Sequence, residues 1–175
     1  MPDKVRLYGS DILRVKCLSR PLEEIKSIIA EQYNLDGYLL NMHQTMVAEH
    51  GMGLAANQIG WTLPIFILKA ENVRGYNEYI NPEILSQEEL VDFENEGCLS
   101  IPGVTFATKR FRKLTLRWED RDGKTQESEF LDLPAFAVQH EMDHLNGKLY
   151  IDQLSMLKRS MVLGKFKKFL RERGR

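Results

Sequence analysis

The sequence predicts an α+β fold in one compact domain, and three observations point to it. Apolar residues recur at helical spacing near the start of the chain and again near its end. Between these regions, short runs alternate apolar and polar residues, as the strands of a half-buried sheet do. Residues 140–144 place two histidines and a glutamate on a segment that also has helical spacing. We therefore expect short antiparallel strands around a central helix carrying His-Glu-x-x-His, with further helices towards both ends.

The first half of the chain predicts one long helix and one strand. Apolar residues at helical spacing indicate a helix over residues 21–50, with Pro21 near its start and Gly51 after its end. Gly37 weakens the prediction that this helix is unbroken. The apolar run at residues 64–68 predicts a short strand.

The second half predicts a hairpin and two helices. Residues 114–130 alternate about a turn at residues 122–123, which indicates two antiparallel strands. Residues 133–146 predict the central helix, which stops near Gly147. Residues 156–175 predict a basic helix at the C-terminal end. Since no repeat or linker interrupts the pattern, we expect residues 1–175 to form one catalytic domain.

The composition is that of an ordinary globular chain. It has 175 residues, 43% of them apolar and 28% charged, which is enough for a sizeable core. We find no secretory signal pattern and no apolar run near the ~20 residues that cross a bilayer. Two cysteines are too few for a disulfide scaffold. We therefore expect a cytoplasmic protein without a membrane or DNA partner.

The segment His140-Glu141-Met142-Asp143-His144 has the spacing of a metal site. Helix positions four residues apart share a face, so both imidazoles can reach one metal ion. The intervening glutamate is offset by about 100° and can address a metal-bound water without being a ligand. This pattern leaves a metallopeptidase or another amidase as one hypothesis. Tyr150, however, stands where the longest metallopeptidase pattern of this type has a third histidine.

Cys98 is the strongest candidate for the third ligand. A thiolate and two imidazoles leave one position of a tetrahedral metal open, which is typical of a catalytic site. Gly97 and Pro102 predict an irregular segment rather than a strand interior, with N–H groups able to form an oxyanion hole. A non-catalytic metal-binding or redox-sensing module built on Cys98 is the other hypothesis. Glu141 argues against it, because a structural metal site needs no general base.

Three segments together carry a family resemblance. They read Gly-x-Gly-Leu-Ala-Ala-x-Gln at residues 51–58, Glu-Gly-Cys-Leu-Ser at 96–100, and Gln-His-Glu-x-Asp-His-Leu-x-Gly at 139–147. Present in this order, they resemble the hallmarks of the peptide deformylase family, and the similarity extends over about residues 5–155. The resemblance implies a metal-dependent hydrolase that removes the N-formyl group from the formyl-methionine of new polypeptides and releases formate.

The resemblance also implies roles for the site residues. The metal would be held by Cys98, His140 and His144, and its bound hydroxide would attack the formyl carbon. Glu141 would act as general base and then general acid, transferring a proton to the departing amine. Charge on the carbonyl oxygen would be stabilised by the metal, the Gln58 side chain and the Leu99 N–H group.

The metal and the substrate pocket follow from the same resemblance. This ligand set suits several metals, but the family's usual ion implies one Fe²⁺ per chain, replaceable by Zn²⁺, Ni²⁺ or Co²⁺. The implied pocket for the methionine side chain is lined by Met52, Gly53, Gly97, Leu133, Phe136 and Ala137. Thr105 stands where many members have arginine or tyrosine, and Phe136 where an aliphatic residue is common. These departures concern substrate preference rather than the reaction.

The C-terminal segment has its own charge. Residues 158–175 contain eight basic residues and one glutamate, a net charge of +7 in a chain whose total is −1. An amphipathic helix of this kind could simply pack on the domain. The alternative is docking on an RNA-rich surface, where neutralised phosphates give salt-dependent affinity, and the family resemblance implies the ribosome as that surface. We otherwise expect a monomer that acts on N-formyl-methionyl peptides.

Overall fold

The computed structural model describes residues 2–174, and it forms one antiparallel sheet with four α-helices. The helices are α1 (Leu22–Ile29), α2 (Leu35–Ala48), α3 (Asp132–Leu145) and α4 (Met156–Glu172). The strands are β1 (Gly53–Ala55), β2 (Ile65–Lys69), β3 (Tyr76–Cys98), β4 (Ile101–Glu119) and β5 (Thr125–Leu131), and they pair in this order. The predicted α+β class is therefore confirmed.

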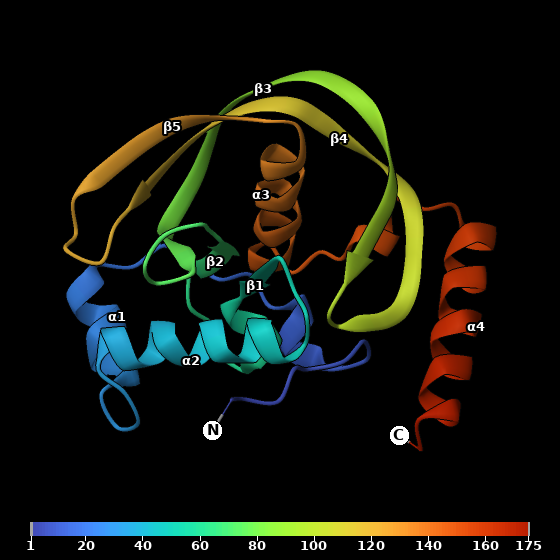
Figure 1. The fold of residues 1–175 in the computed structure, drawn as a ribbon, viewed down its shortest axis with the longest axis horizontal. Helices are drawn as coiled ribbons and strands as arrows, with labels where there is room; N and C mark the ends of the chain where they lie inside the picture. The colour runs from blue at the N-terminus through green and yellow to red at the C-terminus, as the bar shows by residue number, and fades with distance from the viewer. Residues whose placement is uncertain (1, 175) are drawn as a thin grey trace.

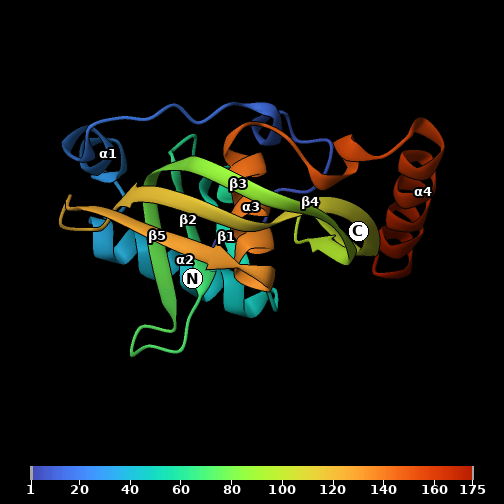
Figure 2. The ribbon, with the colours of Figure 1, turned by 90° about the horizontal axis from the view of Figure 1, so that it is seen from above.

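The sheet bends around one helix. β3 and β4 form a long arch over α3, while α2 crosses on the opposite side of α3 from the top of the arch (Figure 1). Seen from above, β3, β4 and β5 run across α3, with α1 near one end of the molecule and α4 at the other (Figure 2). The arch is possible because the β3–β4 register shifts at several points, and such bulges bend a strand. The central position predicted for the metal-bearing helix is thus observed.

Two expectations about the elements were wrong. The helix expected over residues 21–50 is divided into α1 and α2, because the Asn34 side chain accepts a hydrogen bond from the Gly37 N–H (2.8 Å) and caps a new helix. The strands around α3 are not all short: β3 has 23 residues and β4 has 19. Most side chains in the middle of β3 are exposed and polar, so no alternating pattern marks that strand.

The core forms three apolar clusters. One lies between α1, α2 and the sheet, and a second joins α3 to the sheet. The third contains Cys98 and Ile101 together with Val162 and Phe166 of α4. α4 is therefore packed on the end of the arch through one face. Among the described residues, no helix is both long and apolar enough to cross a membrane.

Candidate metal centre

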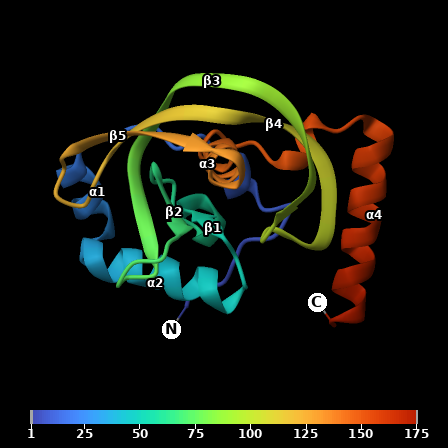
Figure 3. The ribbon, with the colours of Figure 1, turned by 45° about the horizontal axis from the view of Figure 1, so that its top comes forward.

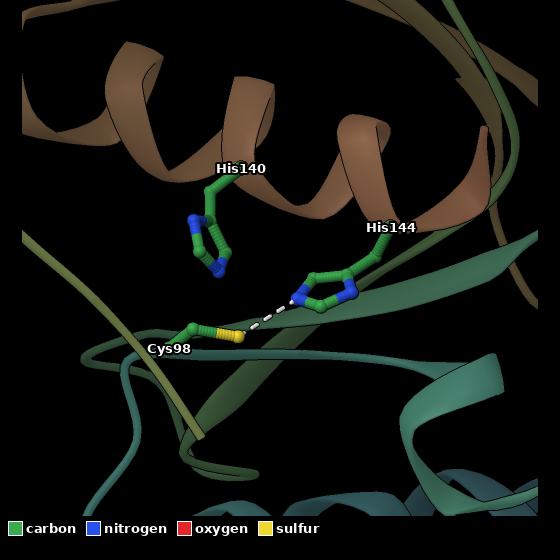
Figure 4. A group of neighbouring side chains, drawn as sticks. All are labelled: Cys98, His140 and His144. Atoms are coloured by element: carbon green, nitrogen blue, oxygen red, sulfur yellow. Dashed lines mark hydrogen bonds between the residues drawn. The ribbon is translucent and has the colours of Figure 1, made fainter. Parts of the chain in front are cut away.

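Three side chains converge beneath the arch. The candidate ligand atoms of Cys98, His140 and His144 all lie within 4.8 Å of one another. Both imidazoles extend from α3 toward the cysteine, which comes from the end of β3 (Figure 4). The distance from Cys98 Sγ to His144 Nε2 is 3.2 Å. The structure thus brings together the three ligands predicted from the sequence.

The local backbone explains this convergence. His140 and His144 are one turn apart on α3, so their rings leave the same side of the helix. Cys98 is the last residue of β3, immediately before a two-residue turn into β4. The expected irregular segment around Cys98 is limited to this turn and to the register shift beside it. The residues on either side of the turn belong to the paired strands β3 and β4. A hairpin end therefore presents the thiol to the helix.

The sequence did not predict how His140 is oriented. His140 Nδ1 lies 2.6 Å from Glu96 Oε1, which leaves Nε2 free to face the metal position. Glu96 in turn accepts hydrogen bonds from Thr108 and from the Arg110 guanidinium, whose Nε donates at 2.9 Å. Partners of this kind fix the ring orientation of metal-ligating histidines. The donor set and its orientation therefore fit a bound metal ion.

Arg110 connects this carboxylate to α3. Its Nη1 lies 2.6 Å from Asp143 Oδ2, and its Nη2 lies 2.5 Å from Glu96 Oε1. Burial alone would raise the pKa of Glu96, but hydrogen bonds from His140 and Arg110 more than offset it and hold that pKa at about 2. Glu96 is thus ionised behind the imidazole of His140. From the sequence, Asp143 is expected to orient a neighbouring group or to support the helix, and it contacts Arg110; no sequence pattern indicates a role for Glu96 or Arg110.

Glu141 lies next to the three candidate ligands without belonging to their group. It is 4% exposed, and its Oε2 has no hydrogen-bond partner within residues 2–174. Burial raises the pKa of Glu141 to about 7. A Cβ atom at Gly53 would overlap the Glu141 carboxylate, so only glycine leaves room for it there. The carboxyl group can exchange a proton near neutral pH.

Gln58 faces the candidate ligands from the glycine-rich segment, residues 51–58. Its Oε1 accepts from the Ala55 N–H (2.9 Å), which orients Nε2 toward Ser100 Oγ (3.2 Å) and Cys98 Sγ (3.8 Å). The preceding residue, Asn57, donates from Nδ2 to the main-chain carbonyl of His144 (2.5 Å). The glycine-rich segment is therefore tied directly to both the cysteine and the metal-bearing helix.

A cleft of about 510 Å³ opens beside these groups. Its lining includes every predicted pocket residue, namely Met52, Gly53, Gly97, Leu133, Phe136 and Ala137, together with the predicted catalytic residues Gln58, Leu99 and Glu141. Cys98 and His140 also face it, whereas His144 is 1% exposed and is not part of the lining. Phe93 also lines the cleft, although no sequence pattern predicts it there. It lies in a largely polar stretch of β3, where no pattern distinguishes it from a surface residue.

The fold and site define a hydrolase with a single-metal centre, and comparisons with known proteins specify it further. The family model of polypeptide deformylases matches residues 2–160. A peptide deformylase of Bartonella henselae is 40% identical over 160 residues, which cover 90% of this chain and 88% of that relative. One from Thermoanaerobacter pseudethanolicus is 44% identical over 149 residues, covering 85% and 87% of the two chains.

Solved structures agree with these sequence matches. The crystal structure of a peptide deformylase from Legionella pneumophila has a TM-score of 0.84 and 34% identity, covering 100% of this chain and 99% of that chain. The chain belongs to the peptide deformylase family. It is accordingly a metal-dependent hydrolase, and its Cys-His-His group accommodates one metal ion.

Proposed function

We propose that this enzyme hydrolyses the N-formyl group of the terminal formyl-methionine of new polypeptides, releasing formate and a free amine. The observation that carries the proposal is the Cys98–His140–His144 group at the cleft, with the buried Glu141 carboxyl beside it. Cys98, His140 and His144 are the proposed ligands. Bound there, the metal would polarise the formyl carbonyl and lower the pKa of water toward 7.

Glu141 is the proposed proton carrier. A carboxyl group with a pKa of about 7 is ionised in a substantial fraction of molecules at neutral pH and can still return a proton. Its unpartnered Oε2 is available to accept the proton of the attacking water and later to deliver it to the leaving amine. Because Glu141 is buried, this transfer would take place away from bulk solvent.

Gln58 and Leu99 are the proposed donors to the formyl oxygen. The Gln58 amide is held by the Ala55 N–H, so its Nε2 is fixed before substrate arrives. Leu99 opens the turn after Cys98 and would contribute its main-chain N–H. Preorganised donors of this kind each contribute about 10²–10³ in rate.

The cleft residues are the proposed substrate contacts. Met52, Leu133, Phe136 and Ala137 would surround the apolar methionine side chain, while Gly53 and Gly97 would let the peptide backbone approach closely. Recognition through the backbone would make the enzyme tolerant of the residues after methionine.

Formate release is the direct test of this function. We expect metal-loaded enzyme to release formate from formyl-Met-Ala-Ser and to leave the acetylated analogue intact. Cleavage of internal bonds in unformylated peptides would instead favour the metallopeptidase hypothesis. Metal binding without any turnover would favour the redox-sensing module.

Fe²⁺ is the proposed metal, one ion per chain, with Zn²⁺, Ni²⁺ or Co²⁺ as substitutes. A thiolate with two imidazoles accepts all four, so availability in the cell decides among them. Metal analysis after anaerobic purification, with activity expressed per metal ion, tests this. Highest activity per ion with zinc rather than iron would contradict the choice.

We further propose that the enzyme is monomeric and cytoplasmic and that residues 1–175 are one catalytic domain. We also propose that this domain docks on the ribosome through α4. The support for docking is the charge of the exposed face of α4. Val162 and Phe166 are buried on one face of this helix. Lys165, Lys167 and Lys168 are exposed. Lys165 and Lys167 could meet phosphates while the apolar face stays packed, and Lys168 could do so by giving up its exposed ion pair with Glu172 (3.8 Å). Truncating α4 is a poor test, because it would remove core side chains.

Substitution of the exposed lysines tests docking without unfolding the helix. We expect the triple change Lys165→Gln, Lys167→Gln and Lys168→Gln to weaken ribosome cosedimentation and its salt dependence, with formate release unchanged. The matched control replaces Lys16, Lys69 and Lys124, which are exposed outside α4 and change the net charge equally. Equal cosedimentation of both triple variants would remove the docking proposal.

A further inference from the structure

Asn57 is buried against His144, and neither residue lines the cleft. Asn57 is 0% exposed and His144 is 1% exposed. Asn57 lies in a short 3₁₀ helix, Ala56–Ile59, directly after β1, and β1 lies between α3 and α2 (Figure 3). This arrangement lets Asn57 Nδ2 donate to the main-chain carbonyl of His144 (2.5 Å). Asn57 therefore contacts a candidate metal ligand from outside the substrate cleft.

Each of these two residues has one further polar atom without a hydrogen-bond partner. Asn57 Oδ1 and His144 Nδ1 are both buried, and neither has a partner within residues 2–174. The amide oxygen can only accept a hydrogen bond, whereas a neutral imidazole that carries its proton on Nδ1 donates from that atom. Buried polar atoms of native proteins are nearly always paired, with ordered water where no protein atom serves. The two atoms are thus complementary, and both need a partner.

Metal binding determines which nitrogen of His144 carries the proton. His144 Nε2 lies 3.2 Å from Cys98 Sγ, so Nε2 is the atom that faces the metal position. A ligating imidazole is neutral, and its proton then lies on Nδ1. His140 has an acceptor for this proton, because its Nδ1 lies 2.6 Å from the Glu96 carboxylate. Within the described residues no protein atom does the same for His144.

We propose that Asn57 is a positioning residue for His144, and that its Oδ1 accepts the Nδ1–H of the ring through one buried water molecule. The inference rests on the proposed function only in taking His144 as a metal ligand. Because Oδ1 is bonded to the same carbon as Nδ2, it also lies beside His144, and one water can span the gap to the ring. The amide then holds His144 by its main chain and by its imidazole, which fixes the orientation and the tautomer of the ligand.

Glu141 is the other residue near the ligands with an unpaired buried oxygen. Glu141 lines the cleft, where the attacking water and the substrate can reach it. Asn57 and His144 do not line the cleft, so the reacting groups cannot satisfy their unpaired atoms. The partner of His144 Nδ1 must therefore belong to the resting protein.

Asn57→Val and Asn57→Thr test the role of the amide. The two new side chains have nearly the same shape, but only threonine has a hydroxyl group, which can still donate to the His144 carbonyl and accept from a water. We expect Asn57→Val to weaken Zn²⁺ binding by about 10- to 100-fold, measured by competition with a chelator, and Asn57→Thr to recover most of that affinity. Thr45→Val is the control: it removes a buried hydroxyl that bonds to the Asn41 carbonyl on α2, and it should leave the affinity unchanged. Equal losses in the two Asn57 variants would assign the effect to packing and overturn the inference.

NMR spectra of the Zn²⁺-loaded unmodified enzyme give a measurement that does not depend on the folding of a variant. The Nδ1–H proton of His144 should exchange slowly with solvent and should show cross-relaxation to a long-lived water molecule. The absorption spectrum of the Co²⁺-loaded enzyme reports the geometry of the ligands, and it should change in Asn57→Val but not in Thr45→Val. A His144 Nδ1–H without a neighbouring water, or a cobalt spectrum that Asn57→Val leaves unchanged, would overturn the inference.

These measurements are independent of deformylation. An enzyme that released no formate would contradict the proposed function, while its Zn²⁺ affinity and its imidazole N–H signal would still decide the role of Asn57. An enzyme that released formate but had equal Zn²⁺ affinity in all three variants would keep the proposed function and lose this inference.

Discussion

Replacing Glu141 with glutamine is expected to lower kcat for deformylation by about 10²–10⁴ while the protein keeps its metal. Glutamine has nearly the same shape but cannot take up the proton of the attacking water. The metal should remain because the candidate ligand group consists of Cys98, His140 and His144 and does not include Glu141. Stopped assays of formate, with metal content measured on the same samples, test both halves of the prediction.

The surroundings of Glu141 also predict a pH dependence. Burial raises the pKa of this carboxyl to about 7, so the ionised form that accepts a proton becomes less populated as the pH falls below 7. We therefore expect kcat/KM of the unmodified enzyme to decrease on the acid side of neutrality. In the residual activity of Glu141→Gln the contribution of the carboxyl group should be absent, so the decrease should be shallower. Full turnover by the variant would refute the assigned role. Loss of metal in proportion to activity would instead make Glu141 a ligand.

The features that could be predicted from sequence are those set by local spacing. His140 and His144 share a helix face whatever surrounds them, so the four-residue interval sufficed to pair them. Cys98 was predicted from the chemistry of a thiolate ligand and supported by the family resemblance, since no local rule brings residue 98 to residue 144. The break between α1 and α2 had a local signal at Asn34 and Gly37, which the apolar periodicity on both sides concealed.

Features that depend on strand register could not be predicted. Glu96 meets Arg110 only because β3 and β4 pair with shifts on both sides of Glu96, and a different register would separate them. Phe93 reaches the cleft for the same reason. Neither residue lies in an alternating or helical pattern, so their positions follow from the curvature of the arch.

The Glu96–Arg110 pair leads to the second large expected effect, which concerns stability. We expect Arg110→Met to lower the free energy of unfolding by about 3–5 kcal/mol, because it leaves a buried carboxylate without its cation. Arg110 is 4% exposed and Glu96 is 3% exposed, so water cannot replace the lost partner. Chemical denaturation at neutral pH, with the same metal loading for each protein, measures the change. Arg117→Met is the matched control. Arg117 of β4 pairs with Glu127 of β5, but both side chains are about half exposed, so the loss of stability should amount to less than about 1 kcal/mol.

Protonation of Glu96 determines how the loss of stability in Arg110→Met changes with pH. The pKa of Glu96 is about 2 in the folded protein and 4.5 ordinarily, so its stabilising contribution is complete above pH 4.5 and is lost as the pH falls toward 2. In Arg110→Met the carboxyl no longer has its cation and should protonate at higher pH, so the stability difference from the unmodified enzyme should narrow on acidification. Adding Glu96→Gln to Arg110→Met should recover part of the loss at neutral pH, since it removes the unpaired charge. A stability difference between Arg110→Met and the unmodified enzyme that does not change with pH would contradict this account, and so would one no larger than that of Arg117→Met. Either result would mean that Arg110 acts through packing of its side chain and not through the charge of Glu96.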